Sequence, residues 1–249
     1  MSRYLPLLLF LLGLSCVQRV PPPAAPAPSA PAPLAAAARP VPSPPPLAAV
    51  RDRLLPALSP ADSGPDLLGR EDLPGTRTLL VVASAGAVRG LPTTAPEAWR
   101  RSTDELFGLA LENLAREEPL RFRTLRLDLG LEILAAQGEA PTLASHALLL
   151  DRHPEALGPF GALVAVPTRH HLLAYPIRDQ RVTLAVQILP LLARRLHAAG
   201  PSPVTPNLYL YRKGRLVQVP YRLDAKGFAL SPPPELLEIL RTAPAAPRP

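Results

Sequence analysis

Proline constrains this chain more than any other residue, since 36 of its 249 residues are proline and 12 of those lie between positions 21 and 50. The stretch PPPAAPAPSAPAPLAAAARPVPSPPP has almost no charge and no periodic apolar face. Such a segment cannot bury enough surface to fold. Proline-rich chains favour the extended polyproline conformation, which rises about 3.1 Å per residue. We therefore predict a Pro/Ala-rich tether across residues 16–50 that contains no ligand site.

The residues before the tether have the three parts of a secretory signal. Arg3 supplies a positive charge, Leu5 to Leu14 form a short apolar run, and small residues follow. The run is shorter than the roughly 20 apolar residues that span a bilayer. We predict that residues 1–15 are a signal peptide. An uncleaved anchor is the alternative.

Cys16 is the only cysteine, and Gly13-Leu14-Ser15-Cys16 resembles the lipobox of bacterial lipoproteins, although Gly13 stands where leucine is usual. The resemblance implies a thioether from Cys16 to a diacylglycerol, cleavage before the cysteine, and a further acyl chain on the freed amine. Two or more chains anchor a protein stably, whereas one binds only briefly. The alternative is a plain secreted protein with an incidental cysteine.

The predicted location is therefore the bacterial cell envelope, with the membrane as partner through the lipid anchor. Val17 rather than aspartate follows the cysteine, which by analogy with enteric sorting favours the outer over the inner membrane. No second thiol exists, so no intramolecular disulfide can form. The folded part must be stable through its hydrophobic core.

The net charge of +7 does not indicate a nucleic-acid partner. Lys213 and Lys226 are the only lysines, and the arginines are scattered without a dense basic cluster. Aromatic residues are too few to form a stacking platform. High arginine, alanine and proline with little lysine is typical of a GC-rich genome. We predict no nucleic-acid binding.

Apolar periodicity predicts both helices and hairpins after the tether. Residues 51–74 are predicted as a short helix, starting at Val50, and a loop. Strands are predicted over residues 78–83, within 120–135, and over 161–166, 171–177, 207–211 and 216–219. Helices are predicted from Ser102 and over residues 142–150, 179–198 and 234–240, with Pro190 kinking or splitting the third. This irregular order favours a single α+β domain over residues 75–241 with a mainly antiparallel sheet and several packed helices, followed by a disordered tail over 242–249.

Several segments, in order and at suitable spacing, resemble the YtpQ-like family of uncharacterised bacterial proteins. They are LLVVASAGAVRGLP, STDELFGLALENL, ASHALLLDR, GALVAVPTRHHLLAYPI and PVTPNLYLYRKGRLVQVP, over roughly 160 residues. The family contains a domain of unknown function, so the resemblance implies a fold and no mechanism. Its members are usually cytoplasmic, and the signal, cysteine and tether are additions here.

The residue types of catalysis and metal binding occur without the spacing that either chemistry needs. His170 and His171 are adjacent in a predicted strand, so they should point to opposite faces. Ser145, His146 and Asp151 lack a nucleophile elbow, and neighbours on a helix diverge by about 100°. We predict no catalytic residue, no metal site and no cofactor, and we expect Ser145 to hydrogen-bond locally. Gly86 and Gly90 are interpreted as a turn or bulge.

Structural roles account for three polar residues of the helix predicted from Ser102. Ser102 and Glu105 match the capping box, in which each side chain accepts a hydrogen bond from the other residue's backbone amide. Asn113 lies among apolar residues of the same helix, so we predict a structural hydrogen bond to a neighbouring strand or loop.

Tyr209 and Tyr211 alternate with two leucines in a predicted strand. With the leucines in the core, the tyrosines would line an outer face together with Arg212 or Arg215. Tyr209, Tyr211 and Arg212 form the predicted binding surface. The leading functional hypothesis is an envelope-anchored lipoprotein with a non-enzymatic binding or assembly domain, whose partner would be an envelope protein. The alternative is a hydrolase-like enzyme whose site is built from distant polar residues.

Overall fold

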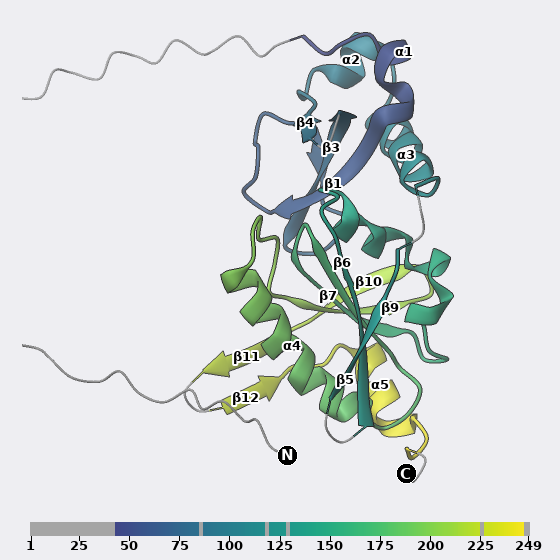
Figure 1. The fold of residues 1–249 in the computed structure, drawn as a ribbon, viewed down its shortest axis with the longest axis vertical. Helices are drawn as coiled ribbons and strands as arrows, with labels where there is room; N and C mark the ends of the chain where they lie inside the picture. The colour runs from purple at the N-terminus through teal and green to yellow at the C-terminus, as the bar shows by residue number, and fades with distance from the viewer. Residues whose placement is uncertain (1–42, 85–86, 118–119, 128–129, 225–226, 247–249) are drawn as a thin grey trace, which may run out of the picture. The chain divides into compact units, whose positions relative to one another are not determined.

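Antiparallel strands and packed helices build the computed structural model, which describes residues 43–84, 87–117, 120–127, 130–224 and 227–246 (Figure 1). The strands form a four-stranded sheet, a six-stranded sheet and a two-stranded hairpin. Within these ranges every strand pair is antiparallel, and helices are interspersed along the chain. The predicted α+β class with a mainly antiparallel sheet is confirmed.

The four-stranded sheet is centred on β3, which confirms the strand predicted over residues 78–83. Its members are β1 (Leu54–Pro60), β2 (Gly69–Arg70), β3 (Thr76–Ser84) and β4 (Ala87–Gly90). β1 pairs with β3 from Leu54 opposite Val82 to Pro60 opposite Thr76. Gly90, predicted in a turn or bulge, lies in β4 opposite Val81, whereas Gly86 is outside the described residues.

The prediction of a helix over residues 50–58 is wrong. Helix α1 (Leu47–Val50) and a 3₁₀ turn, η1 (Arg51–Arg53), end just before β1 begins. Pro56 would lie inside the predicted helix, where proline is disfavoured, whereas an edge strand such as β1 can hold a proline. Because β1 is buried and pairs along its whole length, the folded unit begins before residue 75.

Two helices follow the first sheet. α2 (Ala95–Trp99) is short, and α3 (Thr103–Leu114) lays Leu106, Phe107 and Ala110 against Leu80 and the strands around it. The capping box predicted at Ser102 and Glu105 is present, with both reciprocal hydrogen bonds. It fixes the start of α3 because it satisfies two amides that have no partner inside the helix.

The six-stranded sheet has the order β10-β9-β7-β8-β6-β5. Its strands are β5 (Arg123–Leu127), β6 (Leu131–Gln137), β7 (Ala162–Thr168), β8 (His171–Pro176), β9 (Leu208–Arg212) and β10 (Arg215–Val219). These strands match the predicted ones closely. Lys213 and Gly214 both have positive φ in the β9–β10 turn, the conformation that a two-residue hairpin requires.

Helical segments cover both faces of this sheet. α4 (Val182–Ala199) and α5 (Pro234–Thr242) pack on one face, while the 3₁₀ segments η3 (Leu143–Arg152) and η4 (Pro154–Ala156) pack on the other. The segment predicted as a helix over 142–150 is thus a 3₁₀ helix, interrupted by non-helical Leu149. α4 runs through Pro190, so the predicted split does not occur.

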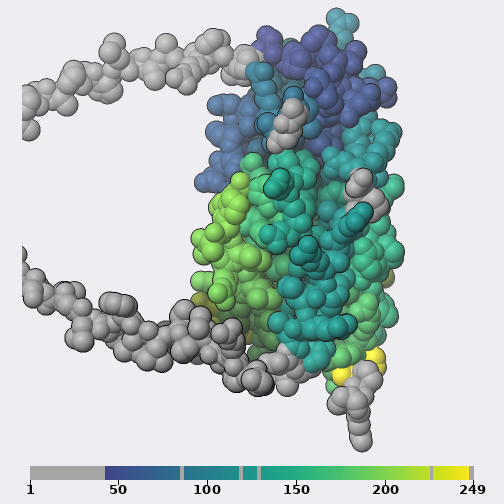
Figure 2. Space-filling view, viewed as in Figure 1, coloured from purple at the N-terminus to yellow at the C-terminus, as the bar shows by residue number. Residues whose placement is uncertain are grey.

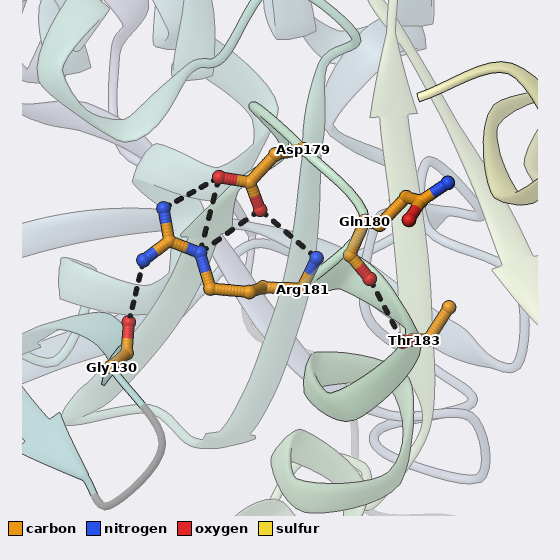
Figure 3. A network of polar contacts seen from close by, with 5 residues as sticks. All are labelled: Gly130, Asp179, Gln180, Arg181 and Thr183. Carbon is orange, nitrogen blue, oxygen red and sulfur yellow. Dashed lines mark hydrogen bonds and ion pairs between the residues drawn. The ribbon is translucent and has the colours of Figure 1, made fainter. Parts of the chain in front are cut away.

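A hydrogen-bonded ion pair fixes the start of α4 (Figure 3). Asp179 is 5% exposed and accepts hydrogen bonds from the backbone amide and the guanidinium of Arg181. A further guanidinium nitrogen of Arg181 donates to the carbonyl of Gly130 at 3.1 Å. Hydrogen bonds from Arg181 are the main cause of a lowered pKa of Asp179. The pair therefore links the loop before α4 to the β5–β6 hairpin.

The sequence reading missed the hairpin of β11 (Tyr221–Asp224) and β12 (Gly227–Leu230). It forms a sheet of its own near α4 (Figure 1), and Tyr221 and Leu230 pack against the core on the α4 side. The Tyr221 hydroxyl donates to the carbonyl of Pro206 at 2.8 Å. Its strands are only four residues long, which is too short for alternation to be a clear signal.

Hydrogen bonds between distant residues join the two larger sheets. The Leu58 amide donates to Ser145 Oγ at 3.1 Å, and the Tyr209 hydroxyl donates to the carbonyl of Pro74 at 2.7 Å. Arg169 donates to Ser59 Oγ at 2.8 Å. Figure 2 shows the two regions, blue and teal to green, packed directly against each other. We call this contact the seam.

Among the described helices, none combines the length and the apolar character that crossing a bilayer requires.

Candidate functional site: a polar cavity at the end of the six-stranded sheet

An open cavity of about 510 Å³ lies where β6 ends and β8 begins. Five polar side chains line it, those of Arg123, Gln137, Glu139, His170 and His171. Three other cavities, beside α3, beside β4 and at the β9–β10 turn, have no histidine among their described lining residues. The combination of two imidazoles with charges of both signs makes this cavity the candidate site.

Strand register and one tight turn bring these residues together. His171 is the first residue of β8 and lies directly opposite Gln137, the last residue of β6. Arg123 in β5 lies opposite Ala135, two residues before Gln137, so its side chain points to the same face. His170 lies in the turn between β7 and β8. The prediction that His170 and His171 point to opposite faces is therefore wrong, because only His171 is in a strand.

The hydrogen bond to a carbonyl assigns the proton of His170. Its Nδ1 lies 3.1 Å from the carbonyl oxygen of Gly138. A carbonyl oxygen can only accept, so Nδ1 carries the proton and donates it. In the neutral ring, Nε2 of His170 then keeps its lone pair and is a hydrogen-bond acceptor or a base.

The neighbouring imidazole has the opposite assignment. Thr168 Oγ1 is buried, accepts the His170 amide at 3.2 Å and lies 2.8 Å from His171 Nδ1. Because this oxygen already accepts the His170 amide, we assign the hydroxyl proton of Thr168 to the hydrogen bond with His171 Nδ1. Burial, and secondly His170, lowers the pKa of His171, so the ring is neutral at pH 7. Its proton is therefore on Nε2, which is a donor.

The two charged side chains of the cavity are free to meet a ligand. Arg123 and Glu139 are both exposed, and within the described ranges neither has a hydrogen bond or an ion pair. On the same strand as Arg123, by contrast, Arg126 is paired with Glu132 at 3.0 Å. The cavity thus offers a cation, an anion, an imidazole acceptor and an imidazole donor.

A second imidazole pair is buried at η3, with His146 inside this segment and His153 directly after it. His146 Nδ1 and His153 Nε2 lie 3.3 Å apart, and the rings of Phe122 and His153 form a T-shaped pair. Glu117 approaches the other end of His146 at 3.8 Å, and Glu155 approaches His153 at 3.9 Å. Within the described ranges no three His, Cys, Asp or Glu side chains are placed to hold a metal ion. This pair is closed to ligands by its burial and contributes to stability.

The stability of the protein should fall as the pH drops below the pKa of a free histidine side chain, about 6.5. Burial, followed by the charge of His146, lowers the pKa of His153, and Glu155 only partly opposes this. Between that lowered pKa and about 6.5 the unfolded chain binds more protons, so this contribution is complete above 6.5 and is lost below it. We expect His153→Gln to be less stable by about 1–2 kcal/mol at pH 7.5. The difference in free energy of unfolding between the native chain and the variant, measured by urea unfolding, should be smaller at pH 5.5. An unchanged difference would contradict a lowered pKa of His153.

The binding surface predicted at Tyr209, Tyr211 and Arg212 is wrong in its tyrosines. Both are buried, at 0% and 4% exposure, because β9 lies inside the sheet and is covered on both faces. Their rings pack among the residues under η3, while the leucines of β9 face α4. Arg212 is half-buried and forms an ion pair with Glu238 at 3.2 Å.

The structural role predicted for Asn113 is confirmed. Its side-chain amide donates to the carbonyls of Arg51 at 2.8 Å and Leu54 at 3.0 Å, so it holds the entry of β1 against α3. Arg116 donates to the Asn113 amide oxygen at 2.9 Å. Ser145 does not bond locally as predicted, because its hydroxyl accepts the Leu58 amide across the seam. Cys16 lies outside the described residues, so its lipidation stays a prediction.

The sequence reading missed Arg123, Gln137 and Glu139. The predicted strands over 161–166 and 171–177 leave only residues 167–170 between them, which indicates a tight turn at Arg169 and His170. That signal places His170 outside the strand. The approach of β5 and the end of β6 depends on pairing between distant residues, for which the sequence carries no local signal.

No protein-family model, curated protein or solved structure matches this chain. The resemblance to the YtpQ-like family therefore stays a prediction. The chemistry of the cavity is what remains to support a function.

Proposed function

We propose that this protein is a bacterial envelope lipoprotein, anchored through Cys16, whose α+β domain binds a small polar ligand in the cavity between β6 and β8. The observation that carries the binding function is the pair of imidazoles with opposite tautomers beside the unpaired Arg123 and Glu139. Small-molecule sites combine a concave surface with a few placed polar groups, and this cavity has both.

Lipid anchoring rests on the order of parts at the start of the chain. A charged tip, an apolar run, a small residue and Cys16 are followed by the Pro/Ala-rich tether. Val17 favours delivery to the outer membrane. We further propose that the domain is an exported relative of the YtpQ-like family, which would make Cys16 the residue that relocates a normally cytoplasmic fold.

A hydrolase-like enzyme is the second candidate, and one observation favours it. His170 Nε2 could act as a general base and His171 Nε2–H as a general acid within the same cavity. Binding is the better proposal because the cavity is open and its charged side chains are solvated. Electrostatic stabilisation of a transition state is strongest where water is excluded.

Acylation provides the direct test of the anchor. In cells fed a clickable fatty acid, the native protein should take up label and fractionate with membranes, because a thioether-linked lipid requires the Cys16 thiol. Cys16→Ala should take up no label and leave the membrane fraction. Ser15→Ala, which keeps a small residue before the cysteine, is the matched control and should be labelled. An unlabelled native protein that fractionates like Cys16→Ala would show that the chain is not a lipoprotein.

A further inference from the structure

We propose that the ligand of this cavity is zwitterionic, a free amino acid or short peptide that carries both an ammonium group and a carboxylate. This inference rests on the proposed binding function and specifies its ligand. It follows from the charges and proton positions of four side chains, those of Arg123, Glu139, His170 and His171.

The negative pole of such a ligand has two partners. The guanidinium of Arg123 presents paired N–H donors in the geometry that suits a carboxylate. His171 adds the neutral Nε2–H donor fixed by Thr168. Within the described residues, the guanidinium of Arg123 and the Nε2–H of His171 form no other hydrogen bond. Both can therefore donate to a ligand carboxylate without breaking an existing bond.

The positive pole also has two partners. Glu139 supplies an unpaired carboxylate, and His170 supplies the Nε2 lone pair fixed by the carbonyl of Gly138. An ammonium group has donors only, so both of these groups match it. The two acceptors come from the turn after β6 and the turn before β8, whereas Arg123 comes from β5.

A ligand of one sign fits the cavity less well. A simple anion would gain Arg123 and His171 but would also approach Glu139, and a simple cation would approach Arg123. Like charges disfavour binding, so the mixed lining selects against both. The volume of about 510 Å³ is within the range of small-molecule sites, about 300–1,000 Å³, and leaves room for the side chains of a short peptide.

Titration of the full chain with capped and uncapped trialanine tests the inference. The imidazole NMR signals of His170 and His171, assigned with His170→Asn and His171→Asn, should shift saturably with free trialanine. Acetylating the amine or amidating the carboxylate should each weaken binding about tenfold, the cost of one charge-assisted contact of about 1.4 kcal/mol. The doubly capped peptide should not bind at the same concentrations.

Two variants assign the poles to residues. Arg123→Gln should bind free and amidated trialanine equally, because the carboxylate has lost its charged partner. Glu139→Gln should bind free and acetylated trialanine equally for the matching reason. Arg121→Gln removes an exposed arginine that does not line the cavity, so it should keep both preferences. The inference would be overturned if Arg123→Gln still preferred free over amidated trialanine, or if Glu139→Gln still preferred free over acetylated trialanine.

Simple ions separate this inference from the proposed binding function. Acetate, inorganic phosphate and ammonium are titrated alongside the peptides. If one of them shifts the histidine signals as strongly as free trialanine does, the cavity binds ligands but the zwitterionic assignment is wrong. If no member of the panel shifts them, the zwitterionic ligand and the binding function of this cavity fail together, while fatty-acid labelling still reports on the anchor.

Discussion

Replacing Gly161 with alanine should lower the free energy of unfolding by about 3–5 kcal/mol, or prevent folding, because strain and overlap add at this position. Gly161 has a φ of +95°, a conformation that side chains with a Cβ rarely adopt. An added Cβ would lie 2.2 Å from the carbonyl oxygen of Tyr211 in the neighbouring strand β9. That oxygen belongs to backbone inside the sheet and cannot move without breaking strand pairing.

Gly108 supplies the matched control for this substitution. It is exposed within α3, and a Cβ added there meets nothing within 4 Å. Gly108→Ala should therefore raise stability by about 0.5–1 kcal/mol, the usual gain of alanine over glycine in a helix. Urea unfolding followed by circular dichroism measures both variants. Equal midpoints for Gly161→Ala and the native chain would show that β7 and β9 do not approach as closely as described.

The second large effect is expected for Asp179→Ala. The carboxylate of Asp179 is 5% exposed and bonds both the backbone and the guanidinium of Arg181 (Figure 3). Removing one partner of a buried pair costs about 3–5 kcal/mol, but the Arg181 side chain is 32% exposed and can be hydrated. We therefore expect a loss of about 2–3 kcal/mol, reduced by solvent screening.

The pH dependence of this loss has a definite sign. Because hydrogen bonds from Arg181 lower the pKa of Asp179 from its ordinary value of 3.8, its contribution is complete above 3.8 and disappears as the pH falls through the lowered pKa. The difference between Asp179→Ala and the native chain should be the same at pH 7 and pH 5. It should shrink in more acidic solution.

Asp104 provides the control for the buried carboxylate. It pairs with Arg70 at 3.1 Å, but its side chain is 92% exposed. Asp104→Ala should cost less than about 1 kcal/mol, since exposed ion pairs and helix-end charges contribute little. If the two aspartate variants were equally stable, burial of the Asp179 pair would not contribute as we infer.

Local signals were enough to predict much of the fold. The capping box at Ser102 places the start of α3, and the glycine between two apolar runs places the β9–β10 turn. The centre of β3, Leu79 to Ala83, is continuously apolar, and the strand is rich in β-branched residues, so its strand character is encoded in its own residues. These elements need no information from the rest of the chain.

β1 could not be predicted in this way. A short apolar run such as Leu54 to Leu58 fits a helix or a strand equally well. Its state is decided by pairing with β3, whose residues come about twenty positions later. The prediction that the tyrosines of β9 are exposed was wrong for a related reason. Alternation of residue types shows that a strand has two faces, but it does not show that helices and 3₁₀ segments cover both faces.

The candidate site was not predicted from the sequence. The two histidines were predicted to point to opposite faces, but both line one cavity, which depends on the Arg169–His170 turn and on the pairing of β6 with β8. The proton positions depend on Thr168 and on the carbonyl of Gly138, and neither has a motif in the sequence. Backbone partners of this kind appear only once the chain has folded.

The seam can form only late in synthesis, long after the ribosome has made all four strands of the first sheet. Its hydrogen bonds join residues 87, 110 and 135 positions apart. Chains dominated by such distant contacts fold slowly, because loops must close before the contacts form. The ribosome makes β1 early, but Ser145, Arg169 and Tyr209 emerge much later. Leu58, Ser59 and Pro74 therefore have none of these partners until most of the chain has been made.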